Sequence, residues 1–288
     1  MKHKNYFILL LLFCGINFSG ANAQTLDPII TNHIKALGGK EKIKQIKTVV
    51  IKSTIVMASA SAESDAGKLS VNSLERITNG KGYRKDVTSE AGELKLSQTE
   101  CYTDNTGQIS GWTTAPQMME SINEAKPRAM SEQEYNAGKD QIYIGNPFIN
   151  YPSQEMKVKL IKKFNGQYCI GIKTNYWTRL YYLDINTFYI TRIEELMARG
   201  LKSVSIFKDY NNVSGIVIPY SITTKLYGRM GLAIAEIFEG ENIDLFDEAL
   251  IGQDPNEKPL TTTTRKITNI TVTVNEPIDS SIYNFPED

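Results

Sequence analysis

The residues that most often carry out catalysis are scarce in this chain. The sequence has two histidines, of which His3 lies near the N-terminus and His33 lies in a predicted amphipathic helix. A serine–histidine–aspartate triad would have to use His33, whose neighbours Asn32 and Ile34 predict a half-exposed structural residue. A catalytic zinc usually has at least three protein ligands, and one histidine with two distant cysteines does not provide that spacing. We therefore expect no enzyme, no metal site and no cofactor.

Adjacent carboxylates are the remaining candidates for acid–base chemistry of the glycosidase type. Glu194 and Glu195 lie in a predicted strand, where successive side chains point to opposite faces, so we expect that they cannot share one site. Asp247 and Glu248 lie in the segment Glu239–Glu257, which has seven acidic residues and no basic one. This composition predicts a solvated loop.

Two cysteines, Cys101 and Cys169, lie in separate predicted strands. A disulfide requires that their Cα atoms come within about 7 Å of each other. Without one, they are expected to be two small apolar core residues. The sequence leaves both readings open.

Apolar side chains gather on a short predicted helix between prolines. Met118, Met119 and Ile122 recur at helical spacing, and Trp112 stands shortly before them. Methionine adapts to irregular partners, so this helix is either a lid over a hydrophobic groove or ordinary core packing.

A hydrophobic period of two follows Thr48 for most of the chain and predicts an antiparallel meander. The predicted strands are Thr48–Ala58, Gly67–Thr78, Gly82–Thr88, Glu93–Thr103, Gln108–Thr113, Met156–Phe164, Gln167–Asn175, Arg179–Asp184, Tyr189–Met197, Leu201–Tyr210, Pro219–Leu226, Leu232–Phe238 and Thr264–Val274. The dipeptide Asn165-Gly166 predicts a two-residue hairpin turn. We expect the tail, Asn275–Asp288, to be extended because it contains Pro277 and Pro286.

Helical patterns lie at the start and in the middle of the chain. The predicted helices are Leu26–Leu37, a short turn over Lys40–Ile46, and two stretches, Gln117–Ala125 and Ser131–Lys139, inside a proline-containing interruption at Ala115–Pro152. No linker divides the sequence, so we expect one domain, with a split near Pro152 as the alternative.

The first residues have the pattern of a secretory signal peptide. Lys2 and Lys4 precede an apolar stretch, Tyr6–Cys14, and Ala21 and Ala23 flank Asn22 before Gln24. The apolar stretch is too short to cross a bilayer core of roughly 30 Å. We expect cleavage of residues 1–23 and a mature periplasmic chain of residues 24–288, with secretion as the second choice. The 32 basic and 32 acidic residues balance and give no footprint for nucleic acid.

Five segments together resemble one family. They are His33–Ile43, Gly82–Val87, Tyr181–Phe188, Phe207–Ile222 and Val274–Tyr283. They resemble bacterial outer membrane lipoprotein-sorting proteins, whose fold is shared with the periplasmic lipoprotein carrier and its outer membrane receptor (LolA/LolB-like).

The resemblance implies a mainly β fold with a few helices, in which a strongly curved, half-open antiparallel β-barrel is closed by lid helices from Ala115–Pro152. In such a carrier an arginine on an early strand hydrogen-bonds the lid; Arg76 is the match and Arg84 the runner-up. The candidate ligand-binding residues are Arg76, Trp112, Met118, Met119, Ile122, Phe148 and Trp177.

The implied function is a periplasmic carrier that holds acyl chains of lipids or lipidated proteins in an apolar half-barrel under a helical lid, with only peripheral or transient membrane contact. The alternative is a non-catalytic envelope interaction module with a filled interior, which docks on another envelope protein. The chain departs from the family in its length, in the acidic segment Glu239–Glu257, and in lacking the lipidated cysteine of the receptor.

Overall fold

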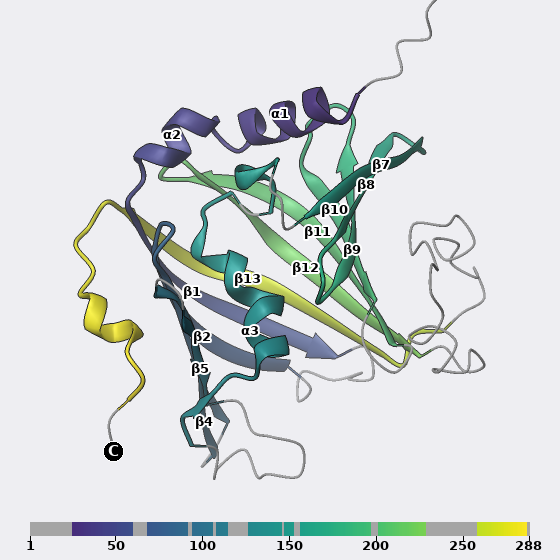
Figure 1. Ribbon diagram of the computed structural model, residues 1–288. Helices are drawn as coiled ribbons and strands as arrows, with labels where there is room; N and C mark the ends of the chain where they lie inside the picture. Colours follow the sequence, from purple (N-terminus) through teal and green to yellow (C-terminus); the bar gives the residue numbers. More distant parts are fainter. Residues whose placement is uncertain are drawn as a thin grey trace, which may run out of the picture.

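The chain forms one large antiparallel sheet with helices on one of its faces (Figure 1). The computed structural model describes residues 25–59, 68–91, 94–105, 108–114, 126–145, 147–152, 156–196, 201–228 and 258–286. Thirteen strands of these residues are ordered β6-β5-β4-β3-β2-β1-β13-β12-β11-β10-β9-β8-β7. Two meanders, β1–β6 and β7–β13, are therefore joined where β1 pairs with β13.

The strands alternate in side-chain direction, as the period of two predicts. Their bounds are β1 Thr48–Ser59, β2 Lys68–Thr78, β3 Gly82–Ala91, β4 Leu94–Asn105, β5 Gln108–Thr113, β6 Arg128–Ala129, β7 Lys157–Phe164, β8 Gln167–Lys173, β9 Thr178–Asp184, β10 Ile190–Leu196, β11 Leu201–Val213, β12 Ile216–Gly228 and β13 Thr261–Val274. The predicted hairpin turn between β7 and β8 is confirmed, because Asn165 and Gly166 both have positive φ, at 47° and 73°.

The helices are short and lie over the same face of the sheet. They are α1 Leu26–Ala36, α2 Lys40–Gln45, α3 Glu132–Gly138 and the 3-10 turns η3 Lys139–Ile142 and η4 Phe148–Asn150; a further turn, η6 Ser280–Tyr283, lies near the C-terminus. Helix α1 ends at two glycines with positive φ, Gly38 at 116° and Gly39 at 91°, a backbone conformation that glycine adopts without strain.

The largest core cluster fills the space between α1 and the second meander. Ile29, Ile30 and Ile34 of α1 pack on Phe148 of η4 and on inward-facing side chains of β8 and β9, including Ile170. Ile29, Phe148 and Ile170 are each 0% exposed. Burial of these apolar side chains fixes α1 on the sheet.

Three expectations from the sequence need correction. The mainly antiparallel β fold with few helices is confirmed, and the sheet is open, since its edge strands β6 and β7 are not paired with each other. The expected strong curvature is wrong, because the sheet is not strongly curled. The tail is not extended throughout, because the Asp279 side chain accepts a hydrogen bond from the Ser281 backbone N–H and η6 forms there. His33 is buried rather than half-exposed, because Ile34 and His33 both face the core.

The two cysteines are free, and both are buried. They are therefore small core residues, Cys101 in β4 and Cys169 in β8. Among the described residues, none of the helices has both the length and the apolar content needed to span a membrane. The leader 1–23, the predicted helix Gln117–Ala125, the predicted strand Leu232–Phe238 and the acidic segment Glu239–Glu257 lie outside the described residues.

Candidate functional site

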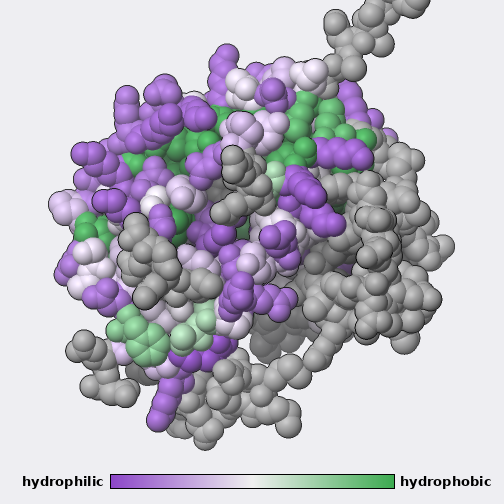
Figure 2. Space-filling model, in the orientation of Figure 1, coloured by the Kyte–Doolittle hydropathy of each residue, from purple (hydrophilic) through white to green (hydrophobic). Residues whose placement is uncertain are grey.

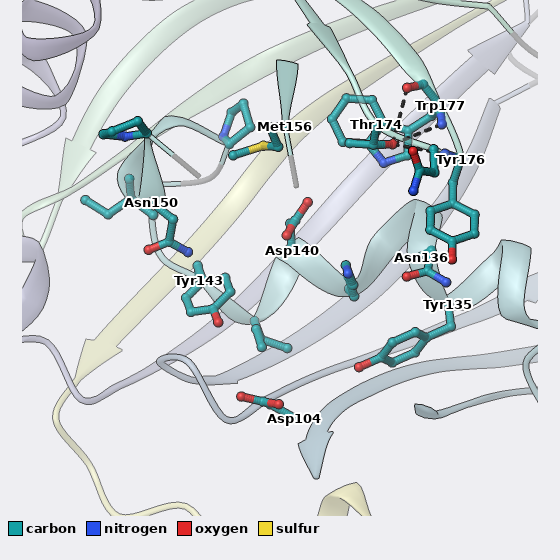
Figure 3. A pocket seen from close by; sticks show the side chains of 16 residues that line it. Asp104, Tyr135, Asn136, Asp140, Tyr143, Asn150, Met156, Thr174, Tyr176 and Trp177 are labelled. Carbon is teal, nitrogen blue, oxygen red and sulfur yellow. Dashed lines mark hydrogen bonds between the residues drawn. The ribbon is translucent and has the colours of Figure 1, made fainter. Parts of the chain in front are cut away.

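A cavity of about 780 Å³ opens on the helix-covered side of the sheet (Figure 3). One wall is α3 and η3, a second is η4 with Pro152 and Met156, and a third is the turn between β8 and β9. The lining is mixed: Tyr143 and Trp177 provide aromatic surface, whereas Asp104 and Asp140 provide carboxylates. The volume lies within the range of about 300–1,000 Å³ that is typical of small-molecule sites.

Helix α3 is held at both ends by local contacts. Ser131 and Glu134 form a capping box, in which each side chain accepts a hydrogen bond from the other residue's backbone N–H. At its end, Gly138 lies directly on Tyr102 of β4, where an added Cβ would come within 2.2 Å of the phenol oxygen. Tyr135 donates a hydrogen bond to the carbonyl of Thr103 at 3.0 Å. The helix predicted at Ser131–Lys139 thus docks on the first meander.

The β8–β9 turn forms the facing wall. Thr174 accepts hydrogen bonds at its hydroxyl from the backbone N–H groups of Tyr176 and Trp177, at 3.2 and 3.1 Å. The Tyr176 hydroxyl reaches across the mouth and donates to Glu132 of α3 at 2.8 Å. This bond joins α3 to the second meander.

Arg179 of β9 forms a second link to α3, next to Trp177 of the cavity wall. Its guanidinium donates to the carbonyl of Ala137 at 3.3 Å and to Glu195 at 3.0 Å. Its central carbon lies 4.3 Å from the centre of the Trp177 ring, which places the cation over the aromatic face. Sequence reasoning missed Arg179, which makes the arginine-to-helix contact that the resemblance assigned to Arg76.

Burial changes the ionisation of the groups around Arg179. Tyr181, two residues along the same face of β9, is fully enclosed, and burial raises its pKa to about 12 although Arg179 opposes that change. Burial lowers the pKa of Arg179, but Tyr181 and Glu195 together raise it by more than burial lowers it. The pKa of Arg179 therefore lies above its usual value. The guanidinium therefore remains charged in its place against Trp177 and α3.

The predicted separation of the two adjacent glutamates is confirmed. Glu195 pairs with Arg179 on the helix side, whereas Glu194 lies 2.9 Å from Arg192, whose guanidinium stacks on Tyr182 on the other side of the sheet. Among the described residues, no group of three His, Cys, Asp or Glu side chains lies close enough to hold a metal ion.

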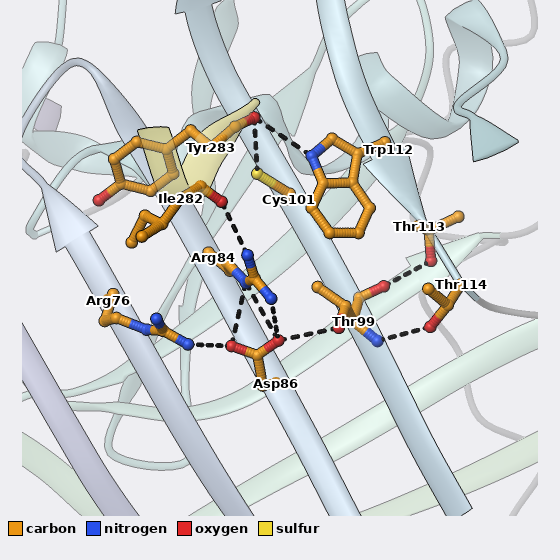
Figure 4. A network of polar contacts seen from close by, with 10 residues as sticks. All are labelled: Arg76, Arg84, Asp86, Thr99, Cys101, Trp112, Thr113, Thr114, Ile282 and Tyr283. Carbon is orange, nitrogen blue, oxygen red and sulfur yellow. Dashed lines mark hydrogen bonds and ion pairs between the residues drawn. The ribbon is translucent and has the colours of Figure 1, made fainter. Parts of the chain in front are cut away.

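A polar network occupies the opposite face of the first meander (Figure 4). Arg76 and Arg84 both donate to the carboxylate of Asp86, and Thr99 donates to it at 2.8 Å. Burial raises the pKa of Asp86, but the hydrogen bonds from Arg84 and Thr99, with the charges of the two arginines, lower it by more. The pKa of Asp86 therefore lies below its usual value. Arg76 therefore contacts Asp86 and not α3.

The C-terminal segment covers this network. Arg84 donates to the carbonyl of Ile282 at 2.9 Å, and the Trp112 indole N–H donates to the carbonyl of Tyr283 at 3.1 Å. The Tyr283 ring lies against Gly82, where an added Cβ would come within 2.8 Å of it. Trp112 is therefore buried under η6 and lies on the face opposite to the cavity.

The predicted ligand-binding residues thus fall into three groups. Trp177 lines the cavity, and Phe148 lies behind it in the packed core; Arg76 and Trp112 lie on the opposite face. Met118, Met119 and Ile122 lie outside the described residues. In the space-filling view, apolar residues show along the upper part of the helix-covered face, whereas hydrophilic residues surround its centre (Figure 2).

Comparisons with solved structures connect this architecture to known folds. A protein domain from Vibrio parahaemolyticus described as outer membrane lipoprotein-sorting aligns over 89% of this chain and 95% of its own, at 10% identity and a TM-score of 0.50. A DUF1329 family protein from Desulfovibrio piger aligns over 89% and 97%, at 10% identity and a TM-score of 0.51. A LolA superfamily protein from Nitrosomonas europaea aligns over 87% and 96%, at 11% identity and a TM-score of 0.49.

No family model matches the chain, and no curated protein matches it. At 10–11% identity, the structural matches show a similarity of fold alone. The resemblance to lipoprotein-sorting proteins is confirmed at that level.

Proposed function

We propose that this chain is a non-catalytic carrier of the cell envelope that binds acyl chains of lipids or lipidated proteins in the cavity beside α3. The observation that carries the proposal is the cavity of about 780 Å³ between helices and sheet in a fold shared with a lipoprotein-sorting domain. In this proposal the open sheet is the floor of the binding site and the covering helices are its lid. Residues 24–288 form the carrier domain, which works in the periplasm after residues 1–23 are removed.

The mixed lining of the cavity fits an amphiphilic ligand. Trp177, Tyr143 and Met156 offer apolar surface to a chain, and each methylene that leaves water contributes about 0.8 kcal/mol. Asp104 and Asp140 add charged surface to the lining. In the proposed mechanism α3 exchanges its contacts with the sheet for contacts with the ligand.

Arg179 controls that exchange in this mechanism, because its bond to the carbonyl of Ala137 ties α3 to β9. Binding then requires that this bond opens. Removing it should favour the open state, since a hydrogen bond to a charged donor contributes about 1.5–3 kcal/mol when buried and less when water reaches it.

The test is the uptake of a fluorescent fatty acid by the wild type and by the double variant Arg179→Met/Glu195→Gln. We expect the wild type to bind and the variant to take up the probe about fivefold faster, which corresponds to roughly 1 kcal/mol. Native mass spectrometry of the protein purified from its host should show a lipid adduct.

The matched control is Arg192→Met/Glu194→Gln. That pair also combines a carboxylate with an arginine stacked on an aromatic ring, but it lies on the face away from α3. Its uptake rate should equal that of the wild type. Absence of binding and of any adduct would reject the carrier; binding with equal rates in all three proteins would reject the role of Arg179 alone.

The second candidate function is an envelope interaction module with a filled interior. It is favoured by the packing under α1, where Ile29, Phe148, Ile170 and Leu183 are each 0% exposed. A pull-down from envelope extract that recovers one partner, together with no bound lipid, would support this module over the carrier.

A further inference from the structure

Two further hollows lie at the junction of α1 and α2, and lysines line both of them. One of about 520 Å³ is lined by Lys40, Lys44, Ile43 and Tyr143, among others. The other, of about 470 Å³, is lined by Lys35, Lys40, Ile30 and Ile34. Lys40 therefore stands between two hollows whose walls carry apolar side chains.

These hollows adjoin the main cavity. Tyr143, Ile149, Asn150 and Pro152 line both the 520 Å³ hollow and the 780 Å³ cavity. The hollow beside α2 and the cavity beside α3 therefore share the wall formed by Tyr143 and η4.

The arrangement of the lysines is unfavourable for the helix itself. Lys40 and Lys44 lie one turn apart, and like charges at this spacing destabilise a helix. The Lys44 ammonium lies 3.9 Å from Glu41, but both side chains are well exposed, at 58% and 84%, so this pair compensates little. Lys40 and Lys44 therefore flank one hollow at a spacing that does not stabilise α2.

Near the junction, the Asp27 carboxylate adds a negative charge on the α1 side, and Lys42 points away from the hollows. Asp27 also lines the 470 Å³ hollow, and its carboxylate accepts a hydrogen bond from the Tyr151 hydroxyl at 2.9 Å. Lys42 lies against Gly215 in the β11–β12 turn, away from the hollows. The charge presented to the hollows is therefore positive on the α2 side.

We propose that Lys35, Lys40 and Lys44 bind the phosphate of an anionic amphiphile whose acyl chain enters the adjoining hollows. This inference rests on the proposed function and adds the substrate class: a phosphate-bearing lipid in preference to a neutral one. Ammonium groups bind phosphate as point charges.

The test compares two tail-labelled fluorescent probes with the same chain, a lysophosphatidic acid and a monoacylglycerol. We expect the wild type to bind the phosphate-bearing probe about tenfold more tightly, since exposed ion pairs contribute modestly and two or three of them act together. Lys40→Gln/Lys44→Gln should remove this preference and leave affinity for the neutral probe unchanged. The preference should also weaken at high salt.

The control is Lys42→Gln/Lys47→Gln, which removes the same charge from exposed lysines of the same segment. It should keep most of the preference; an equal loss in both double variants would overturn the site.

Equal affinity of the wild type for the two probes would overturn this inference and leave the carrier standing. Binding of neither probe would overturn both. Displacement of the phosphate-bearing probe by inorganic phosphate at equal concentration would show a site for free phosphate and overturn the lipid assignment.

Discussion

His33 is held in the core as a neutral imidazole. It is 1% exposed, its Nδ1 lies 2.7 Å from the carbonyl oxygen of Phe188, and its ring meets Phe148 edge to face at 5.3 Å. The carbonyl can only accept, so Nδ1 carries the hydrogen and donates. Burial lowers the pKa of His33 below its usual 6.5, although the bond to Phe188 opposes this.

This burial makes stability depend on pH in one direction. At pH values between the lowered pKa of His33 in the folded state and 6.5, His33 binds a proton in the unfolded chain but not in the folded chain. The free energy of unfolding is therefore fully retained above pH 6.5 and falls as pH drops through this window, by at most about 1.4 kcal/mol per pH unit. Denaturant unfolding at pH 7.5 and 5.5 measures the effect.

The comparison variant is His33→Leu, which replaces the imidazole with an apolar side chain that cannot titrate. All other ionisable groups are common to both proteins, so the difference between their pH dependences isolates His33. Equal slopes in the two proteins would show that His33 titrates in the folded state as it does in the unfolded chain.

The C-terminal segment is the element whose role was least visible in the sequence. The Cys101 thiol and the Trp112 indole both meet the backbone carbonyl of Tyr283, at 3.5 and 3.1 Å. Burial raises the pKa of Cys101 to about 12, which suppresses the reactive thiolate. The segment thus acts as a cover for the outer face of β4 and β5.

Removal of residues 277–288 should therefore expose Cys101. We expect its modification by a thiol reagent, followed by peptide mapping, to become at least about tenfold faster as the thiolate becomes accessible. Cys169, buried in β8 of the other meander, is the internal control and should keep its rate. Faster modification of both cysteines would indicate unfolding, and the milder variant Tyr283→Ala then decides; unchanged modification of Cys101 would refute the covering role.

Local elements could be predicted from the sequence because their causes are local. Strand β5 has the predicted bounds, Gln108–Thr113, and α3 lies inside the predicted Ser131–Lys139. The start of β12 was placed too late, at Pro219, because proline usually marks the beginning of a strand. In the structure Pro219 pairs with Tyr210 next to Asp209, whose φ of 57° departs from extended backbone.

The candidate site could not be predicted in the same way. Arg179 reaches a backbone carbonyl 42 residues away, and such an acceptor leaves no residue-type signature in the sequence. The sequence predicts the lysines of α2 only as part of a helical turn, because their position beside a hollow depends on how η4 packs. Trp177 lines the cavity, whereas Arg76 and Trp112 face the other side because β2 and β5 present them outward.

The whole molecule depends on the pairing of β1 with β13, which joins residues from the two ends of the described chain. Val49 pairs with Val274, and Val49 packs with Val272 and Ile46 in a shared core cluster. Contacts between such distant residues impose a large loop-closure cost, so folding should be slow. They also couple the two meanders energetically.

This coupling predicts a single unfolding transition for residues 24–288. The chain has two tryptophans, Trp112 in β5 of the first meander and Trp177 beside β9 of the second. The single-tryptophan variants Trp177→Phe and Trp112→Phe therefore report the two meanders separately. In each variant, denaturant unfolding followed by fluorescence should coincide with unfolding followed by far-ultraviolet circular dichroism, as two-state behaviour requires.

Because each substitution lowers stability by its own amount, agreement of the two signals within one variant is the criterion. A fluorescence midpoint that separates from the circular dichroism midpoint in either variant would instead indicate two domains, divided near Pro152, and would show that the β1–β13 pairing joins two independently folding units.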